Sequence, residues 1–450
     1  MSYTGNHLIE WGYKPGPWFA EALKRANLMN DAGHSEAEVH QMVNNMAAQV
    51  KPKVKMRSID DLPAGFTNFL PQPQNEVESE NMIEVNRAMV EIMRVPTVVA
   101  GAVMPDACPA GTIPVGGVVA TRDAIHPGYH SADVCCSMAM TVFKDKHDPK
   151  DVLDLLTKIT HFGPTRRNDR PVEVPERIIT GFEKNPFLVN LENTARTHFT
   201  TQGDGNHFYF IGHLESTGEL AVVSHHGSRG FGANVYKRGM KYAQRETAKI
   251  ASGVPKGHAW IDTTTENGQY YIEALNVVRE WTKHNHFAIH RLLETMLDAE
   301  VVDGFWNPHN FVFQKDDVFY HAKGATPSYA GHSRDDFGRC IIPMNMAEPI
   351  LITEHTNALS ALGFAPHGAG RNMSRTRFLR ENDPEPPADI DYRFWCGIPD
   401  KSELPQAYKP SRGVIDAIKK HNLANIVDRV LPYGSIMAGD WEQEAPWRKK

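Results

Sequence analysis

Apolar positions recur along this chain with two periodicities, one typical of helices and one typical of strands. Near the start, apolar residues repeat at helical spacing over residues 18–26 and again over residues 39–46. Between them, Ser35 and Glu38 have the spacing of a capping box, in which each side chain binds the other residue's backbone N–H. Residues 1–50 are therefore predicted to form a small helical extension.

A proline-rich stretch follows this extension and predicts a linker over residues 51–75. Regular patterns are few here, and the stretch contains four prolines, Pro52, Pro63, Pro71 and Pro73. Beyond it, apolar residues at helical spacing over residues 82–92 predict a helix. This helix should end before Pro96, because the residue before a proline is biased away from helical backbone. Residues 76–450 are predicted to form one large domain.

The large domain mixes strand and helix patterns. Up to about residue 230, short apolar runs alternate with glycine turns, and the run over residues 220–223 predicts a strand that delivers His225 to its end. Longer helical patterns cover about residues 233–252 and 269–299, and residues 311–321 predict a hairpin. Strands interleaved with helices leave the fold class open between α+β and mixed α/β.

Composition limits the classes of function. With 41% apolar and 23% charged residues, the chain is ordinary for a soluble globular protein. Its most apolar stretch, over residues 95–119, is broken by prolines and glycines, so no membrane span is predicted. The first residues show no secretory signal and the five cysteines form no CxxC pair, which predicts a cytoplasmic protein with reduced thiols. The net charge of −6 argues against nonspecific coating of nucleic acid, although arginines clustered over residues 166–170 and 371–380 allow a local basic groove.

Six scattered residues have side chains that bind metals, and most of them stand near glycines that let the backbone approach a ligand closely. They are Asp133, Cys136, His207, His225, His309 and His367. The carboxylate and the thiol at Asp133 and Cys136 can face one ion or bridge two, although a lone cysteine more often packs as a small apolar residue. Of the adjacent pair, Cys135 is expected to be the core residue.

His286 and His290 also have the spacing of a metal-binding pair on a helix. Their surroundings are amphipathic, and no glutamate follows His286 directly. We therefore expect this pair to be packed or solvated and not to bind a metal.

His367 begins a His-Gly-Ala-Gly-Arg segment and has two interpretations from its neighbours alone. It is either a metal ligand or a nucleophile whose phosphoryl or nucleotidyl adduct is held by Arg371 and Arg375. A glycine turn before a helix, over residues 224–230 with Arg229, predicts a phosphate cradle. The sequence contains neither a P-loop motif nor a serine-centred nucleophile elbow, which excludes those two kinds of site.

Taken together and in this order, the segments resemble the RtcB family of RNA-splicing ligases. The resemblance covers about residues 76–439, and its motifs are specific only in combination. They are Met104-Pro105-Asp106, residues 113–117, Asp133 with Cys136, residues 203–208, His225 with residues 227–230, His309-Asn310, residues 323–326, residues 367–371 and residues 407–409. The resemblance implies an α+β fold with a single large catalytic core of mixed sheets flanked by helices, and the helical extension lies outside it.

The resemblance also implies a role for each candidate residue. Two Mn²⁺ ions would be held by Asp133, as the bridging ligand, and by Cys136, His207, His225 and His309. His367 would be the nucleophile that GTP nucleotidylates. The implied nucleotide-binding residues are Asn206, Asn310, Asn345, His367, Gly370 and Tyr408, the last by stacking on the base. The implied phosphate- and RNA-binding residues are Arg229, Lys323, Arg371 and Arg375.

The activity implied by the resemblance is the joining of RNA ends. The nucleotide would pass from the histidine to an RNA 3′-phosphate, and a 5′-hydroxyl would then displace it; a 2′,3′-cyclic phosphate end would first be opened. An archease-like activator is the implied protein partner. Two other functions stay open, namely a metal-dependent phosphodiesterase or phosphotransferase that acts on RNA ends without ligation, and an RNA-end-binding protein whose catalysis has decayed.

The sequence departs from the family pattern beside the implied nucleotide. Phe210 stands where the family has a glutamate that reads the guanine edge, and residues 344–346 read Met-Asn-Met where the family has glycine, serine and methionine. Cys108 replaces a histidine, and a lysine expected near residues 438–439 is absent. Because a buried polar contact to an exocyclic group discriminates strongly between bases, its loss predicts relaxed or altered nucleotide choice.

Overall fold

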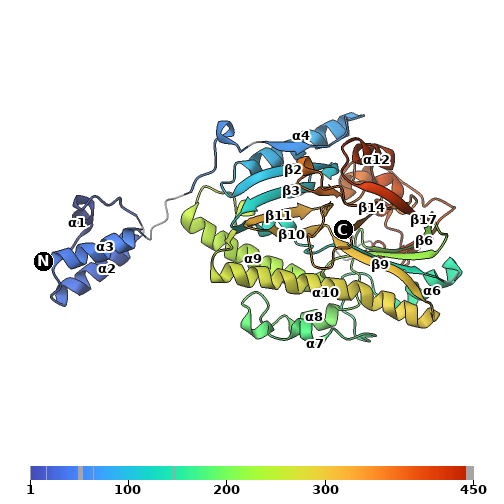
Figure 1. Cartoon of the computed structure of the whole chain (residues 1–450), viewed down its shortest axis with the longest axis horizontal. Helices are drawn as coiled ribbons and strands as arrows, with labels where there is room; N and C mark the ends of the chain where they lie inside the picture. Colours follow the sequence, from blue (N-terminus) through green and yellow to red (C-terminus); the bar gives the residue numbers. More distant parts are fainter. Residues whose placement is uncertain (1, 17, 49–53, 64, 145–146, 442–450) are drawn as a thin grey trace. The chain divides into compact units, whose positions relative to one another are not determined.

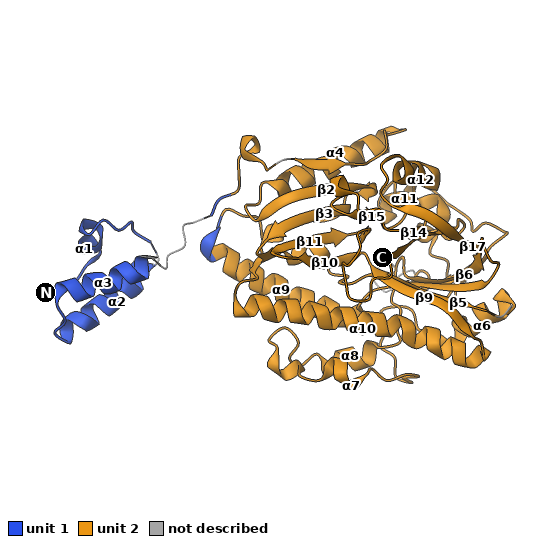
Figure 2. Ribbon diagram, in the orientation of Figure 1, with its two compact units in different colours: residues 1–55, 249–252 blue, residues 56–248, 253–450 orange. Residues whose placement is uncertain are grey.

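The computed structural model describes residues 2–16, 18–48, 54–63, 65–144 and 147–441. The chain forms two compact units, one of residues 1–55 with 249–252 and one of residues 56–248 with 253–450 (Figure 2). Parts of the three predicted segments lie outside the described residues, namely 1, 17 and 49–50 of the extension, 51–53 and 64 of the linker, and 145–146 and 442–450 of the large domain. Among the described residues, no helix combines the length and apolarity that a membrane span requires.

The smaller unit is helical, with α1 (Gly5–Glu10), α2 (Trp18–Asp31) and α3 (Glu36–Ala48). The predicted capping box begins α3, since the backbone N–H of Ser35 donates to Glu38 Oε2 at 2.8 Å and the backbone N–H of Glu38 donates to Ser35 Oγ at 3.4 Å. The two predicted helices are confirmed, and α1 is an addition to them. Their apolar faces share a small core of Leu8, Ala22, Ala26, Val39 and Val43.

The larger unit contains two main sheets (Figure 1). In the described part of the chain, a five-stranded sheet has the order β1-β2-β3-β11-β10; its strands are β1 (Phe66–Asn68), β2 (Val98–Cys108), β3 (Val115–Arg122), β10 (Asn310–Lys315) and β11 (Val318–Lys323). An eight-stranded sheet has the order β13-β14-β17-β6-β7-β5-β9, with β16 paired to β17. Its strands are β5 (Ser137–Phe143), β6 (Phe208–Leu214), β7 (Leu220–His226), β9 (Val301–Pro308), β13 (Arg339–Ile342), β14 (Ile350–Glu354), β16 (Asp391–Phe394) and β17 (Asn425–Met437).

Helices and two short strand pairs complete this unit. The pairs are β4 (Ala124–Ile125) with β8 (Ile261–Asp262), and β12 (Ala325–Pro327) with β15 (Phe364–Pro366). The helices are α4 (Glu76–Met93), α5 (Pro127–His130), α6 (Pro149–Ile159), α7 (Glu176–Ile179), α8 (Glu192–His198), α9 (Arg229–Ile250), α10 (Glu266–Leu297), α11 (Arg375–Glu381) and α12 (Ser411–Lys420). This arrangement is the α+β core of mixed sheets flanked by helices that the family resemblance implies.

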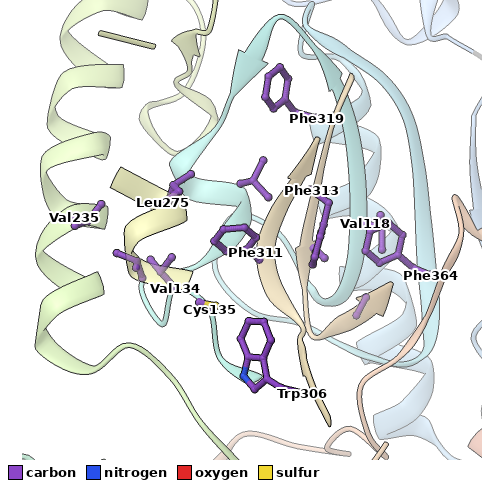
Figure 3. Packing of buried hydrophobic residues seen from close by; sticks show 14 of the residues in the cluster. Val118, Val134, Cys135, Val235, Leu275, Trp306, Phe311, Phe313, Phe319 and Phe364 are labelled. Carbon is purple, nitrogen blue, oxygen red and sulfur yellow. The ribbon is translucent and has the colours of Figure 1, made fainter. Parts of the chain in front are cut away.

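The five-stranded sheet is covered on both faces, as its side-chain alternation requires. On β3, Val118 packs in the cluster that includes residues of α9 and α10, and the next residue, Val119, packs in the cluster that includes α4. Figure 1 shows α4 on one side of this sheet and α9 with α10 on the other. Figure 3 shows Phe311 and Phe313 of β10 within the first cluster, with Leu275 of α10 and Val235 of α9.

The eight-stranded sheet explains where the two adjacent histidines at the end of β7 point. Val222 packs with α6 on one face, and Val223 packs on the other face. Continuing this alternation, Ser224 and His226 face α10, where His226 stacks on His286 at a ring-centroid distance of 3.5 Å. His225 therefore points to the opposite face, where the chain crosses between the two sheets.

The main predicted elements are present with shifted ends. The predicted strand at residues 220–223 lies within β7, the long helices are α9 and α10, and the hairpin is β10–β11, which pair with Asn310 opposite Lys323. Strands β9 and β12–β17 were not individually predicted, and neither was β1. β1 lies in the stretch predicted as a linker and pairs in parallel with β2; its three residues are too few to show an alternating pattern.

Candidate functional site

Most of the predicted site residues converge on one cavity of about 370 Å³ in the larger unit. It lies where loops connect the two sheets, since His309 joins β9 of the eight-stranded sheet to β10 of the five-stranded sheet. The predicted residues that line it are Asp133, Cys136, Asn206, His225, His309, Asn310, Lys323, Asn345, His367, Gly370, Arg371, Arg375 and Tyr408. His207 lies directly behind this lining, within 3.2 Å of Asp133 and 3.5 Å of Cys136.

The metal-binding candidates form two overlapping groups among the described residues. Cys136, His225 and His309 form one group, Asp133, Cys136 and His207 form the other, and within each group the ligand atoms lie within 4.8 Å of one another. Cys136 Sγ lies 3.2 Å from His225 Nε2, which lies 3.2 Å from His309 Nε2. Cys136 thus belongs to both groups, whereas Asp133, the bridging ligand implied by the resemblance, belongs to one.

Local backbone geometry aims these side chains at the cavity. Cys135 has a left-handed backbone (φ 60°) and packs its own side chain in the core, as predicted, which lets Asp133 and Cys136 on either side face the same space. His207 Nδ1 bonds the Gln202 carbonyl oxygen at 2.7 Å, and His225 Nδ1 bonds the Asn206 carbonyl oxygen at 2.9 Å. These bonds leave both Nε2 atoms free to act as ligands.

The electrostatics of the site suit a bound cation. Burial, and then the neighbouring His207 and His367, lowers the pKa of His225 to about 3, so this imidazole is neutral and can ligate. Burial, and then Asp133, raises the pKa of the Cys136 thiol well above its usual range. A cation at Cys136 reverses this effect and favours the thiolate. One carboxylate, one thiol and three imidazoles are a donor set that fits divalent transition-metal ions.

Gly227 keeps the space that the Asp133 carboxylate occupies, because a Cβ at residue 227 would overlap Asp133 Oδ1. We expect Gly227→Ala to displace this carboxylate and to weaken metal binding at these groups by roughly 10–100-fold, as changes beside metal ligands do. Isothermal titration of metal-free protein with Mn²⁺ measures the effect. Gly253→Ala is the matched control, since a Cβ at residue 253 meets no atom within 4 Å and should leave the affinity unchanged; equal affinities in both variants would contradict this reading.

His367 stands beside the metal-binding groups and is held by a buried carboxylate. Its Nδ1 donates to Asp106 Oδ2 at 2.7 Å, and Asp106 is fully buried. The rings of His309 and His367 have centroids 4.9 Å apart. Because Asp106 occupies Nδ1, the Nε2 lone pair of His367 remains available to a substrate atom in the cavity.

A comparison with known families decides the affiliation of the chain. The family described as tRNA-splicing ligase RtcB matches residues 178–438, which is more than half of the chain. The chain belongs to the RtcB family. The RNA-splicing ligase RtcB of Escherichia coli K12 is 26% identical over 357 residues, which cover 70% of this chain and 85% of the relative. The tRNA-splicing ligase RtcB of Archaeoglobus fulgidus is 23% identical over 423 residues, which cover 75% of this chain and 87% of the relative.

In this RtcB-family chain, a buried acidic residue organises the basic side of the cavity. Glu403 is fully buried and pairs with Arg371 at 2.6 Å and with Arg375 at 2.5 Å. It also accepts a hydrogen bond of 2.5 Å from the Tyr408 hydroxyl, and the Arg371 guanidinium lies 5.0 Å from the centroid of the Tyr408 ring. Although burial raises the pKa of Glu403, the two arginines and Tyr408 outweigh it and hold this pKa below its usual value. The carboxylate thus fixes both arginines and the ring.

The other two predicted phosphate-binding residues differ in position. Lys323 lines the cavity and donates from Nζ to the carbonyl oxygens of Ala110 and Ile113, at 3.0 and 3.1 Å. Arg229 is not among the described residues that line the cavity. Its guanidinium donates to Thr201 Oγ1 at 3.2 Å and to the Gly163 carbonyl oxygen at 2.8 Å. The structure therefore brings Lys323 into the cavity and turns Arg229 toward neighbouring loops.

The cavity wall is apolar at the positions where the sequence departs from the RtcB family pattern. Phe210 is 1% exposed, packs in the core of the eight-stranded sheet and also lines the cavity. The apolar residues that line this wall are Phe208, Phe210, Met344, Met346, Ile350 and Met437. Asn345 also lines the cavity, but its amide is engaged locally, with Nδ2 bonded to Glu348 at 2.8 Å and Oδ1 to the Ala347 N–H at 2.9 Å.

The helical pair His286 and His290 is packed, which is one of the two outcomes expected for it. His286 bonds the hydroxyls of Ser137 and Ser224 at 3.0 and 2.7 Å, and His290 bonds those of Thr141 and Ser224, both at 2.8 Å. All are buried behind the sheet. These imidazoles satisfy the polar groups of the core.

Two residues of the site were not singled out from the sequence. Asp106 belongs to the Met-Pro-Asp segment that supports the family resemblance, so a signal for it existed, although its pairing with His367 depends on tertiary structure. Glu403 stands in no recognisable motif. Only the folded chain shows that it lies between two arginines from another segment.

Proposed function

We propose that this chain is a metal-dependent RNA ligase that joins an RNA 3′-phosphate or 2′,3′-cyclic phosphate end to a 5′-hydroxyl end through a nucleotidylated His367. The observation that carries the proposal is the place of His367, which is oriented by Asp106 and stands beside the metal-binding groups and the basic side of one cavity. Membership of a family whose relatives are named RNA-splicing and tRNA-splicing ligases supports the same conclusion.

Two Mn²⁺ ions would be held by the two overlapping groups. The grouping favours Cys136 as the shared ligand, with His225 and His309 on one side and Asp133 and His207 on the other. When bound, such ions neutralise negative charge on phosphate oxygens and on a departing pyrophosphate.

The first chemical step uses the free nitrogen of His367. Its Nε2 attacks the α-phosphorus of a nucleoside triphosphate; an N–P bond forms as the bond to pyrophosphate breaks, and pyrophosphate leaves. The Nδ1 proton stays hydrogen-bonded to Asp106, whose charge stabilises the positive ring of the adduct. Lys323, Arg371 and Arg375 line the cavity and would bind the phosphates. Asn206, Asn310, Gly370 and Tyr408 line it as well and would contact the nucleotide.

The RNA steps then regenerate His367. An oxygen of the RNA 3′-phosphate attacks the phosphorus of the adduct, so the N–P bond breaks and a pyrophosphate link joins the RNA end to the nucleoside monophosphate. The 5′-hydroxyl of the second RNA attacks the 3′-phosphorus, which closes the phosphodiester and releases the nucleoside monophosphate. A 2′,3′-cyclic end first adds water to give the 3′-phosphate. The reaction would take place in the cytoplasm, and an archease-like protein would activate it.

GTP is the proposed nucleotide, but the apolar wall predicts weak selection among bases. A site that hydrogen-bonds an exocyclic group rejects the wrong analogue by about 10⁴-fold or more, whereas an apolar pocket discriminates by roughly 10–200-fold. We therefore expect kcat/KM for nucleotidylation with GTP to exceed that with ATP by no more than roughly 200-fold. Single-turnover labelling with each α-labelled nucleotide measures it. A preference near 10⁴-fold would show that a polar contact absent from Phe210 and Asn345 reads the base.

The proposed function is tested with paired RNA ends. Purified protein with Mn²⁺ and nucleoside triphosphate is given an RNA with a 3′-phosphate or a 2′,3′-cyclic end together with a 5′-hydroxyl RNA. A joined product that requires nucleotide supports the ligase. Opening of the cyclic end without joining would instead establish a phosphodiesterase, and binding without turnover would establish an RNA-end-binding protein. The same reactions with an archease-like protein added test the activator.

A further inference from the structure

A second group of buried nitrogen and oxygen donors lies at one end of the β13–β14 hairpin. His332 and Asp336 lie in the loop between β12 and β13, and His355 directly follows β14. Antiparallel pairing of β13 with β14, continued by a hydrogen bond of 3.1 Å from the His355 N–H to the Gly338 carbonyl oxygen, brings these segments together. One donor atom from each of the three side chains lies within 4.8 Å of the others.

The two imidazoles approach the Asp336 carboxylate closely, each facing a different oxygen, at spacings compatible with a shared metal ion. His332 Nδ1 lies 3.3 Å from Asp336 Oδ2, and His355 Nε2 lies 3.4 Å from Asp336 Oδ1. In a tetrahedral zinc site with bonds of about 2.0–2.1 Å, neighbouring ligand atoms are about 3.3–3.4 Å apart. The side chains of His332, Asp336 and His355 are only 3%, 5% and 8% exposed, so they are almost fully removed from solvent.

His355 provides the second, independent observation. Both of its ring nitrogens are buried, and neither has a hydrogen-bond partner among the described residues. Buried polar atoms in folded proteins are normally hydrogen-bonded, so an imidazole without a hydrogen bond at either nitrogen, beside a carboxylate, calls for a ligand. A metal ion would take up the Nε2 lone pair.

Asp336 is already held in the orientation of a ligand. The Gly331 N–H donates to its Oδ2 at 2.7 Å, and the Gly338 N–H donates to its Oδ1 at 2.9 Å. Both glycines have positive φ, at 76° and 74°, which these turns around the carboxylate require. Hydrogen bonds to ligating carboxylates are a regular feature of metal sites.

We propose that His332, Asp336 and His355 bind a zinc ion that fastens the loop before β13 to the end of β14. Two imidazoles and one carboxylate favour zinc over the oxygen-liganded ions magnesium and calcium, and water would complete the coordination. The competing arrangement contains no metal. In it, a protonated His332 pairs with Asp336 and donates to the Tyr329 carbonyl oxygen, which lies 3.2 Å from Nδ1.

The ion would stabilise a segment that reaches the cavity wall. The loop is anchored on α10, where Asp335 pairs with Arg279 and with Lys283, the latter at 2.5 Å. After the loop, β13 runs directly into Met344 and Met346 of the cavity wall. The zinc site nevertheless requires no RNA chemistry, so the inference goes beyond the proposed ligase function and stands independently of it.

The test measures zinc binding in full-length protein whose first metal site is disabled by Cys136→Ala. After removal of all metals, the protein is dialysed against Zn²⁺ and its zinc content is measured by plasma mass spectrometry across a range of zinc concentrations. We expect one zinc ion per chain in this background. Adding Asp336→Asn, which keeps the shape of the side chain, or His355→Gln should weaken zinc binding at least 100-fold, whereas His421→Gln, a histidine that packs on Phe69, should not.

A spectroscopic and a thermal readout complete the test. Co²⁺ in place of zinc should give the visible absorption of a tetrahedral nitrogen–oxygen site, and zinc should raise the melting temperature of the background protein but not of the Asp336→Asn protein. The proposal is overturned if Asp336→Asn and His421→Gln retain equal zinc. If the Cys136→Ala background does not fold, the same comparison is made in the otherwise unaltered chain, where Asp336→Asn should lower the zinc content by one ion per chain.

Discussion

His367→Ala is expected to abolish covalent labelling by an α-labelled nucleoside triphosphate and to lower RNA joining on the order of 10³-fold or more. The physical reason is that the proposed pathway runs through a covalent bond to His367 Nε2. Among the imidazoles around the cavity, His207, His225 and His309 are committed to the metal-binding groups, and His367 is the one held by a carboxylate at Nδ1. Without its Nε2, the N–P bond to residue 367 cannot form. The RNA 3′-phosphate then receives no nucleotide and is not activated for joining.

Two further variants separate chemistry from folding. His421→Gln replaces a histidine outside the cavity and should retain full labelling. Asp106→Asn keeps the shape of the side chain but removes the charge that stabilises the adduct, so labelling should slow by roughly 10²-fold while Mn²⁺ binding is unchanged. Labelling of His367→Ala at the rate of the His421→Gln control would disprove the role given to His367.

The second large effect concerns the ligand shared by the two metal-binding groups. Cys136→Ala should lose both manganese ions, because Cys136 belongs to both groups. His309→Ala and Asp133→Ala should each retain one ion, because each residue belongs to a single group. RNA joining should fall by several orders of magnitude in all three variants, since the proposed reaction needs both ions.

Manganese content after dialysis distinguishes Cys136 from Asp133 as the ligand shared by the two ions. The melting temperature of each variant is measured alongside, to show that the variant is folded. If Asp133 is the bridge, Asp133→Ala loses both ions and Cys136→Ala retains one. The geometry predicts the reverse, because Cys136 Sγ lies 3.2 Å from His225 Nε2 and 3.5 Å from His207 Nε2, one in each group. Manganese is the ion to measure, because the second proposed site, at Asp336, favours zinc.

Strand periodicity explains why much of the site could be predicted. A strand that ends at His225 puts this histidine and its neighbour His226 on opposite faces, and the structure places His225 in the cavity and His226 against α10. The long helices were equally predictable, because their apolar stripes repeat over many turns. Local patterns of this kind depend only on residues close together in the sequence.

The relation between segments could not be predicted in the same way. The choice between Asp133 and Cys136 as the shared ligand depends on which histidines of other segments each side chain meets in the folded chain. Glu403 meets Arg371 and Arg375 only after the chain has folded. The group at His332 and His355 likewise exists only because β13 and β14 form a hairpin, and the sequence spacing of the two histidines gives no sign of it.

The central claim is that His367 carries the nucleotide covalently. Its most direct test is mass spectrometry of the protease-digested protein after incubation with Mn²⁺ and each of the four nucleoside triphosphates, under non-acidic conditions that preserve a phosphoramidate. The account predicts a nucleoside monophosphate adduct on the peptide that contains His367, located on this histidine by fragmentation and released when RNA with a 3′-phosphate is added. An adduct on another residue, or none with any of the four nucleotides, would contradict it.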